Sequence, residues 1–488
     1  MIITSLVAFL LPAYLVHHLS TQMYGAWVLI LNLSAYVGYL DFGVQTAVSK
    51  YIAEYQATGD HVGSVQCVSA GLLIMSIAST VGILLTCGLA YWVPMLFRNM
   101  PPTLYHDVRV SILLVGISSS ISLSASIFPA IFLGLQRYKV TATVSVISRL
   151  LYATVLCVAV YLHSTLATMG KSVAMVYLIM SLLQVVAWKK FAGHIAVRLY
   201  PIDLAKLRQM LKYCFVLTVW SVCMLFILGL DLTIVGHYDF GQVAYYSIAT
   251  APTNFMLVII GALLGPLLPA SSALSTSRTS QQMGRILLRT TRYTTIILLL
   301  SGLPLLVGGF LVLRIWVGSN YAFNSVQLLR ILLLANITRQ LCAPYATMVV
   351  ATAKQSVATF AAITEGVVNL AASLWLARRF GAMGVAMGTL IGACASVAMH
   401  FGVSMQYTHN LAISRTELLL QGLLRPATMA IPSVLLVPFW WFSGKPSMSV
   451  QLWSAWGLAT LLLMWYASMV DGDRTALIQT VKSSLNVT

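Results

Sequence analysis

Seven polar side chains lie inside or at the ends of long apolar runs, and they are the sequence's candidates for chemistry. An ionisable group in an apolar layer costs several kcal/mol unless it faces a wet cavity or a partner of opposite charge. Each is therefore expected either to serve binding and transport or to be neutralised by a neighbour. The seven are Asp41, Lys50, Arg149, Asp231, Arg339, Glu365 and Asn369.

Arg149 and Arg339 are the two cations deepest within apolar runs. Arg149 stands about nine residues from the start of its run, or ~13 Å along a helix that rises about 1.5 Å per residue. Arg339 is similarly deep. A guanidinium fork can neutralise an anionic ligand. The alternative is that each arginine pairs with an acid and fixes helix packing.

Glu365 is an acid at a comparable depth, and Asn369 follows one helical turn later on the same face. A shift of 216 residues lays Arg149 over Glu365. We expect these two residues to face a shared central cavity from opposite halves of the chain. Glu365 could bind a proton or a cation there, or simply hold an arginine.

The other three candidates lie near the ends of runs. Asp41 stands beside Gly43 at the inner end of one run, and Asp231 stands near the outer end of another. Either carboxylate could cap a broken helix or act in transport. Lys50 follows the first of these runs, where its ammonium could meet an anionic ligand or snorkel to an interface.

The composition is that of a chain whose solvent is lipid. Of 488 residues, 59% are hydrophobic and 8% are charged, and the mean hydropathy is +0.89. The net charge of +17 comes from basic residues spread singly between apolar runs, which does not favour a nucleic-acid partner. The seven cysteines form no CxxC pair, so no disulfide framework and no metal site are expected. The first residues carry neither a basic segment nor a small-residue cleavage site, so no signal peptide is expected.

The fold class follows from the apolar runs: we predict an all-α polytopic membrane protein with about fourteen transmembrane helices. Placing both termini in the cytoplasm puts 18 Lys and Arg residues in inner segments and 8 in outer ones, with Arg149 and Arg339 within spans. Basic residues gather on the cytoplasmic side of membranes. The predicted spans are 1–19, 24–44, 66–92, 108–133, 141–163, 166–188, 212–236, 243–268, 293–317, 325–350, 356–377, 382–406, 424–442 and 450–470.

The domain division follows from a basic loop and an internal repeat. Residues 189–212 hold six Lys or Arg against the single acid Asp203, and they are expected to be cytoplasmic. Residues 23–51 can be laid on 242–270 without gaps, which suggests a duplicated six-span bundle. The predicted parts are an N-terminal lobe 1–188, a linker 189–211, a C-terminal lobe 212–406, two appended spans in 424–470 and a cytoplasmic tail 471–488.

Two stretches resemble the polysaccharide flippases of the Wzx type. The first is LSTQMYGAWVLILNLSAYVGYLDFGVQTAVSKYIAEYQATGD (19–60), with its tyrosine-glycine, its DFG and its basic-aromatic pair. The second is ITEGVVNLAASLWLARRFGAMGVAMGTLIG (363–392), with its glutamate, its asparagine-leucine and a helix of small residues. The resemblance implies membership of the exporter superfamily that also holds multidrug antiporters and lipid II flippases.

The resemblance implies a function as well. It implies a flippase, not an enzyme, that moves an undecaprenyl-diphosphate-linked oligosaccharide to the outer leaflet of a bacterial inner membrane by alternating access. Arg149, Arg339 and Lys50 would then meet the diphosphate, and Glu365, Asn369, Asp41 and Asp231 would serve coupling or line the cavity. Membrane lipids, H⁺ or Na⁺, and a polysaccharide polymerase with its chain-length regulator are the expected partners. No cofactor is expected, because the sequence has no GxxxxGK[ST] motif.

Two alternatives remain open from the sequence. One is an ion-coupled multidrug antiporter of the same superfamily, which more acids than bases in the cavity would favour. The other is an integral-membrane polysaccharide polymerase, although such enzymes generally carry a large outer loop and the outer loops here are short.

Overall fold

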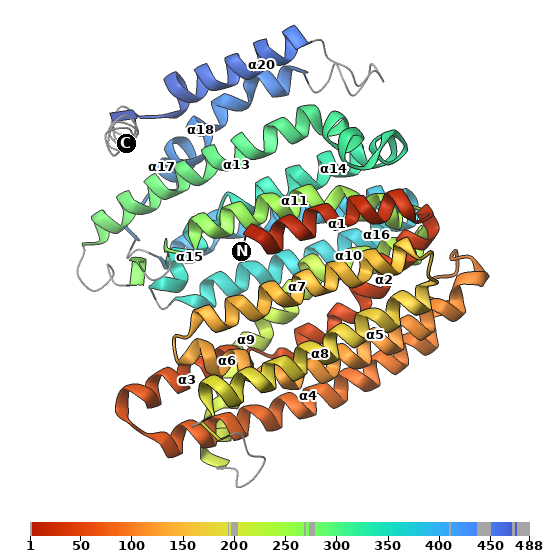
Figure 1. Cartoon of the computed structure of the whole chain (residues 1–488). Coiled ribbons are helices and arrows are strands. Elements are labelled where there is room, and N and C mark those ends of the chain that lie inside the picture. Colours follow the sequence, from red (N-terminus) through yellow and green to blue (C-terminus); the bar gives the residue numbers. More distant parts are fainter. Residues whose placement is uncertain are drawn as a thin grey trace, which may run out of the picture. The chain divides into compact units, whose positions relative to one another are not determined.

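The chain folds entirely into helices in the part that the structure describes. That structure is a computed structural model, and it describes residues 2–193, 195–196, 204–267, 270–272, 279–352, 354–408, 411–436, 450–470 and 474–475. No strand occurs among these residues, so the predicted all-α class is confirmed (Figure 1). Helices are the expected solution because a helix satisfies its own backbone polar groups, which lipid cannot do. Asp203 and most of the predicted tail lie outside the described residues.

The chain divides into two compact units. The first comprises residues 1–248 and 373–385, and the second comprises 249–372 and 386–488. The predicted lobe boundary at 189–211 and the two appended spans stay predictions.

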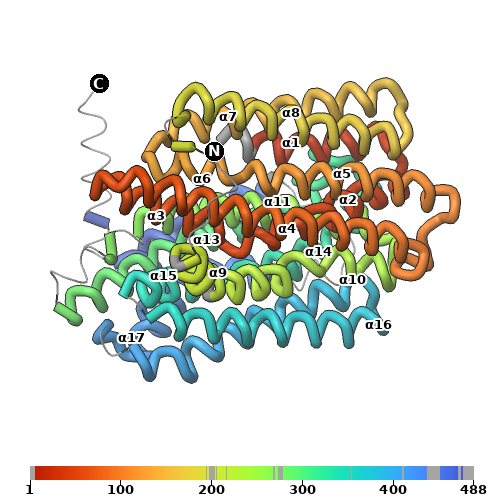
Figure 2. The backbone as a smooth tube through the Cα atoms, turned by 90° about the horizontal axis from the view of Figure 1, so that it is seen from below, coloured from red at the N-terminus to blue at the C-terminus, as the bar shows by residue number. Residues whose placement is uncertain are grey.

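The first unit is a bundle of long helices in which α4, α5, α8, α7 and α1 pack in that order, and α2 packs on α5 (Figure 2). Its elements are α1 (Ile2–His18), α2 (Thr21–Ala35), η1 (Tyr36–Asp41), α3 (Val44–Thr58), α4 (His61–Leu96), η2 (Pro102–Leu104), α5 (Tyr105–Ala125), α6 (Ile127–Gly134), α7 (Tyr138–Tyr161), α8 (Leu166–Ala192), α9 (Leu204–Met224), η3 (Leu225–Gly229), α10 (Asp231–Tyr238), η4 (Phe240–Gln242) and the start of α11 (Val243–Leu264).

The second unit is built around α13 (Ser280–Val317), which packs against α14 (Ser319–Gln340), α15 (Ala343–Ala351) and η7 (Leu418–Leu424). Its other elements are the rest of α11, the ends of α16 (Gln355–Gly402), whose middle belongs to the first unit, η5 (Ser404–Tyr407), α17 (Arg415–Glu417), α18 (Arg425–Ala427), η8 (Thr428–Ala430), α20 (Val450–Leu463) and η9 (Met464–Ser468).

The number of spans differs from the sequence prediction. Eleven helices in the described part are long and apolar enough to cross a membrane, and the apolar segment Leu6–His18 is shorter. Part of the difference lies in α16, which covers two predicted spans, 356–377 and 382–406, as one helical stretch with a kink at Gly381. The predicted count of fourteen is therefore not confirmed.

Helix breaks occur where the sequence supplies glycine or a wider turn. Between η1 and α3, Phe42 and Gly43 adopt left-handed backbone angles with φ of 50° and 73°. Between α9 and α10 the chain forms the single π-helical turn η3. Both breaks are in the first unit, and both expose backbone groups that neighbouring side chains can bind.

Candidate functional site

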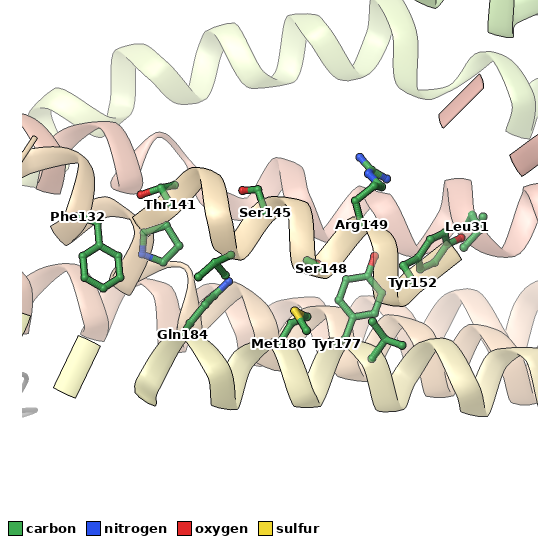
Figure 3. A pocket seen from close by; sticks show the side chains of 13 residues that line it. Leu31, Phe132, Thr141, Ser145, Ser148, Arg149, Tyr152, Tyr177, Met180 and Gln184 are labelled. Carbon is green, nitrogen blue, oxygen red and sulfur yellow. The ribbon is translucent and has the colours of Figure 1, made fainter. Parts of the chain in front are cut away.

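A cavity of about 570 Å³ lies within the first unit, between α7 and α8, with walls from α2 and α6 (Figure 3). Thr141, Ser145 and Arg149 stand four residues apart and point the same way from α7. Tyr177 and Gln184 extend from α8 toward α7. More than half of the lining side chains are polar: Thr141, Ser145, Ser148, Arg149, Tyr152, Tyr177 and Gln184. Such a wall offers hydrogen-bond donors and acceptors beside apolar surface.

Arg149 is the charged residue of this cavity, as Figure 3 shows. Its side chain is exposed, and no acid forms an ion pair with it in the described part of the chain. The guanidinium interacts electrostatically with the phenols of Tyr152 and Tyr177. The site therefore carries an uncompensated positive charge beside neutral hydrogen-bonding groups, which favours an anionic ligand.

A second cavity of about 380 Å³ adjoins the first, because both are lined by Leu31, Arg149 and Tyr152. Its other walls come from α1, α2, α10 and the start of α11, and they are mostly apolar. These walls are Ala8, Leu11, Pro12, Leu15, Tyr24, Trp27, Val28, Asn32, Leu232 and Ser247.

A polar network that no sequence motif predicted joins α2 to the break before α10. The Asn32 side-chain amide and the Tyr36 hydroxyl both donate to the Gly229 carbonyl, each at 3.2 Å. Thr233 Oγ1 donates to Asn32 Oδ1 at 3.0 Å and also bonds the Tyr36 hydroxyl. The Gly229 carbonyl is the last of the π-helical turn η3, so the network satisfies a group that the break exposes.

Arg339 and Glu365 form an ion pair inside the second unit. The Arg339 Nε donates to Glu365 Oε1, and Nη1 donates to Asn336 Oδ1 at 3.1 Å. Glu365 is 4% exposed. The structure therefore brings Arg339 and Glu365 together. This is the alternative in which an arginine pairs with an acid and fixes helix packing.

Asn369 is buried one turn after Glu365, where α16 packs on its own second half within the second unit. It is 1% exposed. A side chain at Gly392 would come within 2.7 Å of the Asn369 Cβ and 3.1 Å of the Glu365 carbonyl oxygen. The absence of a side chain at Gly392 is thus what permits this close approach.

Arg330 is a buried arginine that sequence reasoning missed. It lies on α14 and is 4% exposed. Its Nε donates to the Leu306 carbonyl at 3.3 Å and its Nη1 donates to Gln327 Oε1 at 3.5 Å. Arg330 is the sixth residue of the predicted span 325–350, so the sequence placed it among the basic residues at the outer side of the membrane. In the structure, both of these hydrogen-bond partners belong to the second unit.

The remaining predicted residues occupy helix breaks or ends. Asp41 Oδ1 accepts from the Gln45 backbone N–H at 3.4 Å, across the break before α3. Asp231 begins α10, is 8% exposed and accepts from the Tyr246 hydroxyl at 3.1 Å. Asp41 thus binds a backbone N–H in the first turn of α3, whereas α10 has no side-chain cap and Asp231 binds a tyrosine hydroxyl instead.

Lys50 lies on α3 among aromatic rings. Its ammonium is 4.6 Å from the ring centroid of Tyr213 and 5.3 Å from that of Tyr51. A cation over two rings is stabilised by their quadrupoles while it keeps its N–H donors. Lys50 does not line either of the two cavities described above.

Asp239 is a further charged residue that the sequence did not single out. It lies between the candidate membrane helices, next to η4. Burial raises the pKa of the Asp239 carboxyl above its usual range, and a hydrogen bond from the Gln242 backbone opposes this shift. A Cβ built on Gly381 would lie 2.9 Å from the Asp239 Oδ2, so the carboxylate packs against the kink of α16 within the first unit.

The comparisons with known proteins agree on family and fold. A family model described as "Polysaccharide biosynthesis protein" matches residues 1–275. No curated protein matches the chain by sequence. Among solved structures, the lipid II flippase MurJ in an inward closed conformation is similar, with 13% identity over 94% of this chain and 95% of that chain and a TM-score of 0.66.

Two other solved structures belong to the MOP superfamily. An inward-facing multidrug resistance MATE family transporter is 14% identical over 84% of this chain and 99% of that chain, with a TM-score of 0.64. A transporter from Pyrococcus furiosus, described as having a binding pocket of reverse polarity, is 14% identical over 85% of this chain and 94% of that chain, with a TM-score of 0.59. These likenesses establish a shared fold.

Proposed function

The chain belongs to the polysaccharide biosynthesis protein family, and from that premise we propose that it is a flippase for an undecaprenyl-diphosphate-linked oligosaccharide. It would move this lipid from the cytoplasmic to the outer leaflet of a bacterial inner membrane by alternating access. The protein is a multi-pass membrane protein with the fold of flippases and transporters. The substrate, the direction and the membrane are the proposal.

The observation that carries the proposal is Arg149 in the cavity of the first unit. A diphosphate must cross the hydrocarbon layer, where its charge is costly without a counterion. An exposed guanidinium without an ion pair in the described residues can supply that counterion. An acid in the wall would favour a cationic drug instead, and the described residues that line this cavity include none.

The polar wall around Arg149 supports a sugar ligand. The hydroxyl groups of Ser145 and Ser148 and the amide nitrogen of Gln184 can exchange hydrogen bonds with sugar hydroxyls. The rings of Tyr152 and Tyr177 add flat surfaces beside them. Many individually weak hydrogen bonds suit a ligand that must be released on the other side of the membrane.

The other predicted residues keep proposed roles of different kinds. Lys50, on the predicted cytoplasmic side, would attract the diphosphate before it enters. Arg339 would act through its ion pair with Glu365, which could open when an H⁺ or Na⁺ ion neutralises the carboxylate. Asn369, Asp41 and Asp231 would hold the neighbouring helices. A polymerase and a chain-length regulator would receive the delivered glycan.

A test in cells compares delivery of the lipid-linked glycan to the outer face with and without this protein. The strain lacking it would be complemented by wild type, Arg149→Ala or Arg149→Lys at equal membrane abundance. We expect precursor to accumulate on the inner face in the deletion strain and with Arg149→Ala, and partial recovery with Arg149→Lys.

The same experiment separates the proposal from its rivals. If delivery were unchanged without the protein while tolerance to drugs or cations changed, a multidrug antiporter would be favoured. If precursor reached the outer face but remained unpolymerised, a polymerase would be favoured.

A further inference from the structure

Two cavities of different chemical character meet at one guanidinium in the first unit. The larger, between α7 and α8, is lined by seven polar side chains, Arg149 among them, and by six apolar ones. The smaller, beneath α1, is lined mainly by aliphatic side chains and Trp27. Arg149 and Tyr152 belong to both. The unit thus presents a polar chamber, a cation and an apolar chamber in sequence.

The polar chamber and the apolar chamber follow one another in a definite direction along α7. On α7 the polar chamber extends from Thr141 to Tyr152, whereas the apolar chamber takes only Arg149 and Tyr152. Since α7 begins on the predicted cytoplasmic side, the polar chamber lies nearer the cytoplasm. The apolar chamber lies further from it. A lipid of the inner leaflet has the same polarity, with its headgroup toward the cytoplasm and its chain toward the membrane midplane.

We propose that the apolar chamber beneath α1 is a binding site for the isoprene units next to the diphosphate, with the diphosphate at Arg149 and the sugars in the polar chamber. This proposal rests on the proposed function and adds to it a subsite for the lipid stem. The site accepts the substrate in its inner-leaflet orientation. Substrate recognition therefore includes the prenyl chain as well as the glycan.

The size and walls of the chamber limit what it holds. A volume of about 380 Å³ is that of a small-molecule site and is too small for a complete polyprenyl chain. Only the proximal units enter, and the remainder of the chain stays in the bilayer. Contact with the apolar side chains of Leu11, Pro12 and Val28 stabilises a bound apolar chain, while Arg149 binds its charged end.

The test measures how much a prenyl chain adds to diphosphate binding. Neryl diphosphate, with ten carbons, and methyl diphosphate are titrated against the purified full chain in lipid nanodiscs. We expect wild type to bind neryl diphosphate at least about tenfold more tightly. Leu11→Gln should remove most of this preference and leave methyl diphosphate binding unchanged. Leu10→Gln is the matched control, because the neighbouring Leu10 is 52% exposed and does not line the chamber.

The outcomes separate the subsite from the function. An unchanged neryl preference in Leu11→Gln, with both ligands weakened by Arg149→Gln, would overturn the subsite and leave the flippase proposal standing. Failure of wild type to bind either diphosphate would overturn both.

A second measurement does not depend on the stability of a variant. A neryl diphosphate with a diazirine on its first isoprene unit should label α1 and α2 on irradiation, and excess unlabelled neryl diphosphate should suppress that labelling. Labelling confined to other helices would contradict the proposal.

Discussion

At the scale of single residues, the two deepest arginines of the sequence have opposite environments. Arg149 projects into a cavity of the first unit without an ion pair among the described residues. Arg339 is paired with Glu365, which is itself buried. Removing one partner of a buried ion pair strongly lowers the stability of the fold, because the other partner is left as an uncompensated charge. The two arginines should therefore differ in what their loss costs.

We predict that Glu365→Gln and Arg339→Gln each lower the free energy of unfolding by about 3–5 kcal/mol. The double variant should lose much less than the sum, because neither charge is then left alone. Unfolding of the purified protein in detergent measures this cycle. Arg149→Gln is the control and should change stability by no more than about 0.5 kcal/mol. Additive losses at Arg339 and Glu365 would contradict the pairing.

Asp239 gives a prediction about pH. Its raised pKa means that the folded protein favours the neutral carboxyl, so this contribution to stability is present below the ordinary aspartate pKa and is lost as pH rises through the raised value. Asp239→Asn, which stays neutral, should match wild type at about pH 3.5 and be more stable at about pH 7. Melting curves of both proteins across this interval would show it; parallel curves would argue against burial of the charge.

The sequence predicted what these side chains could do chemically, but it did not predict which side chains they contact. The depth of Arg149 in its apolar run predicted a residue facing a cavity or an acid, and the structure places it in a cavity. The pairing of Arg339 with Glu365 joins residues on different helices, and no local spacing rule connects them. Arg330 was missed because a residue near a span end can turn outward or inward, and only packing decides which.

At the scale of elements, glycines decide where helices break and where they approach. Gly43, at φ 73°, ends the break between η1 and α3, and a Cβ there would lie 2.5 Å from the Leu217 Cβ. Two glycines of residues 381–392 permit a close approach: a Cβ at Gly384 would lie 2.4 Å from the Leu376 backbone, and one at Gly392 would lie 2.7 Å from the Asn369 Cβ. The DFG of the sequence thus marks a break whose geometry needs its glycine.

Gly43→Ala should destabilise the protein by about 2 kcal/mol or more, because the left-handed conformation and the contact with Leu217 both oppose a methyl group. Gly38→Ala, in the preceding element η1, is the control: nothing lies within 4 Å of its Cβ position. Thermal unfolding of the two variants compares them directly. Equal effects would mean that the break tolerates a side chain.

Other element boundaries were harder to read from the sequence. The predicted spans 356–377 and 382–406 form one helical stretch because the chain turns at a single residue, Gly381, with φ 54° and no loop. The π-helical turns η3, η7 and η9 cannot be recognised from the pattern of apolar residues, because each adds one residue to a turn without changing the composition.

At the scale of the whole molecule, composition and the apolar runs predicted an all-helical membrane protein, because lipid leaves few other solutions for the backbone. The division into two compact units is a property of packing, and the unit boundaries fall within helices α11 and α16 rather than in a polar loop. No composition shift in the sequence marks them. Function at this scale depends on whether a charged headgroup passes through the protein.

The most direct test of that claim is translocation of a lipid-linked glycan by the reconstituted protein. A prenyl-diphosphate glycan with a labelled sugar is placed in the inner leaflet of sealed vesicles, and its appearance outside is followed by an impermeant enzyme that cleaves the sugar. We predict that wild type moves it, that Arg149→Gln slows transfer by about 10- to 100-fold, and that Arg149→Lys is intermediate. Transfer by Arg149→Gln at the wild-type rate would contradict the account.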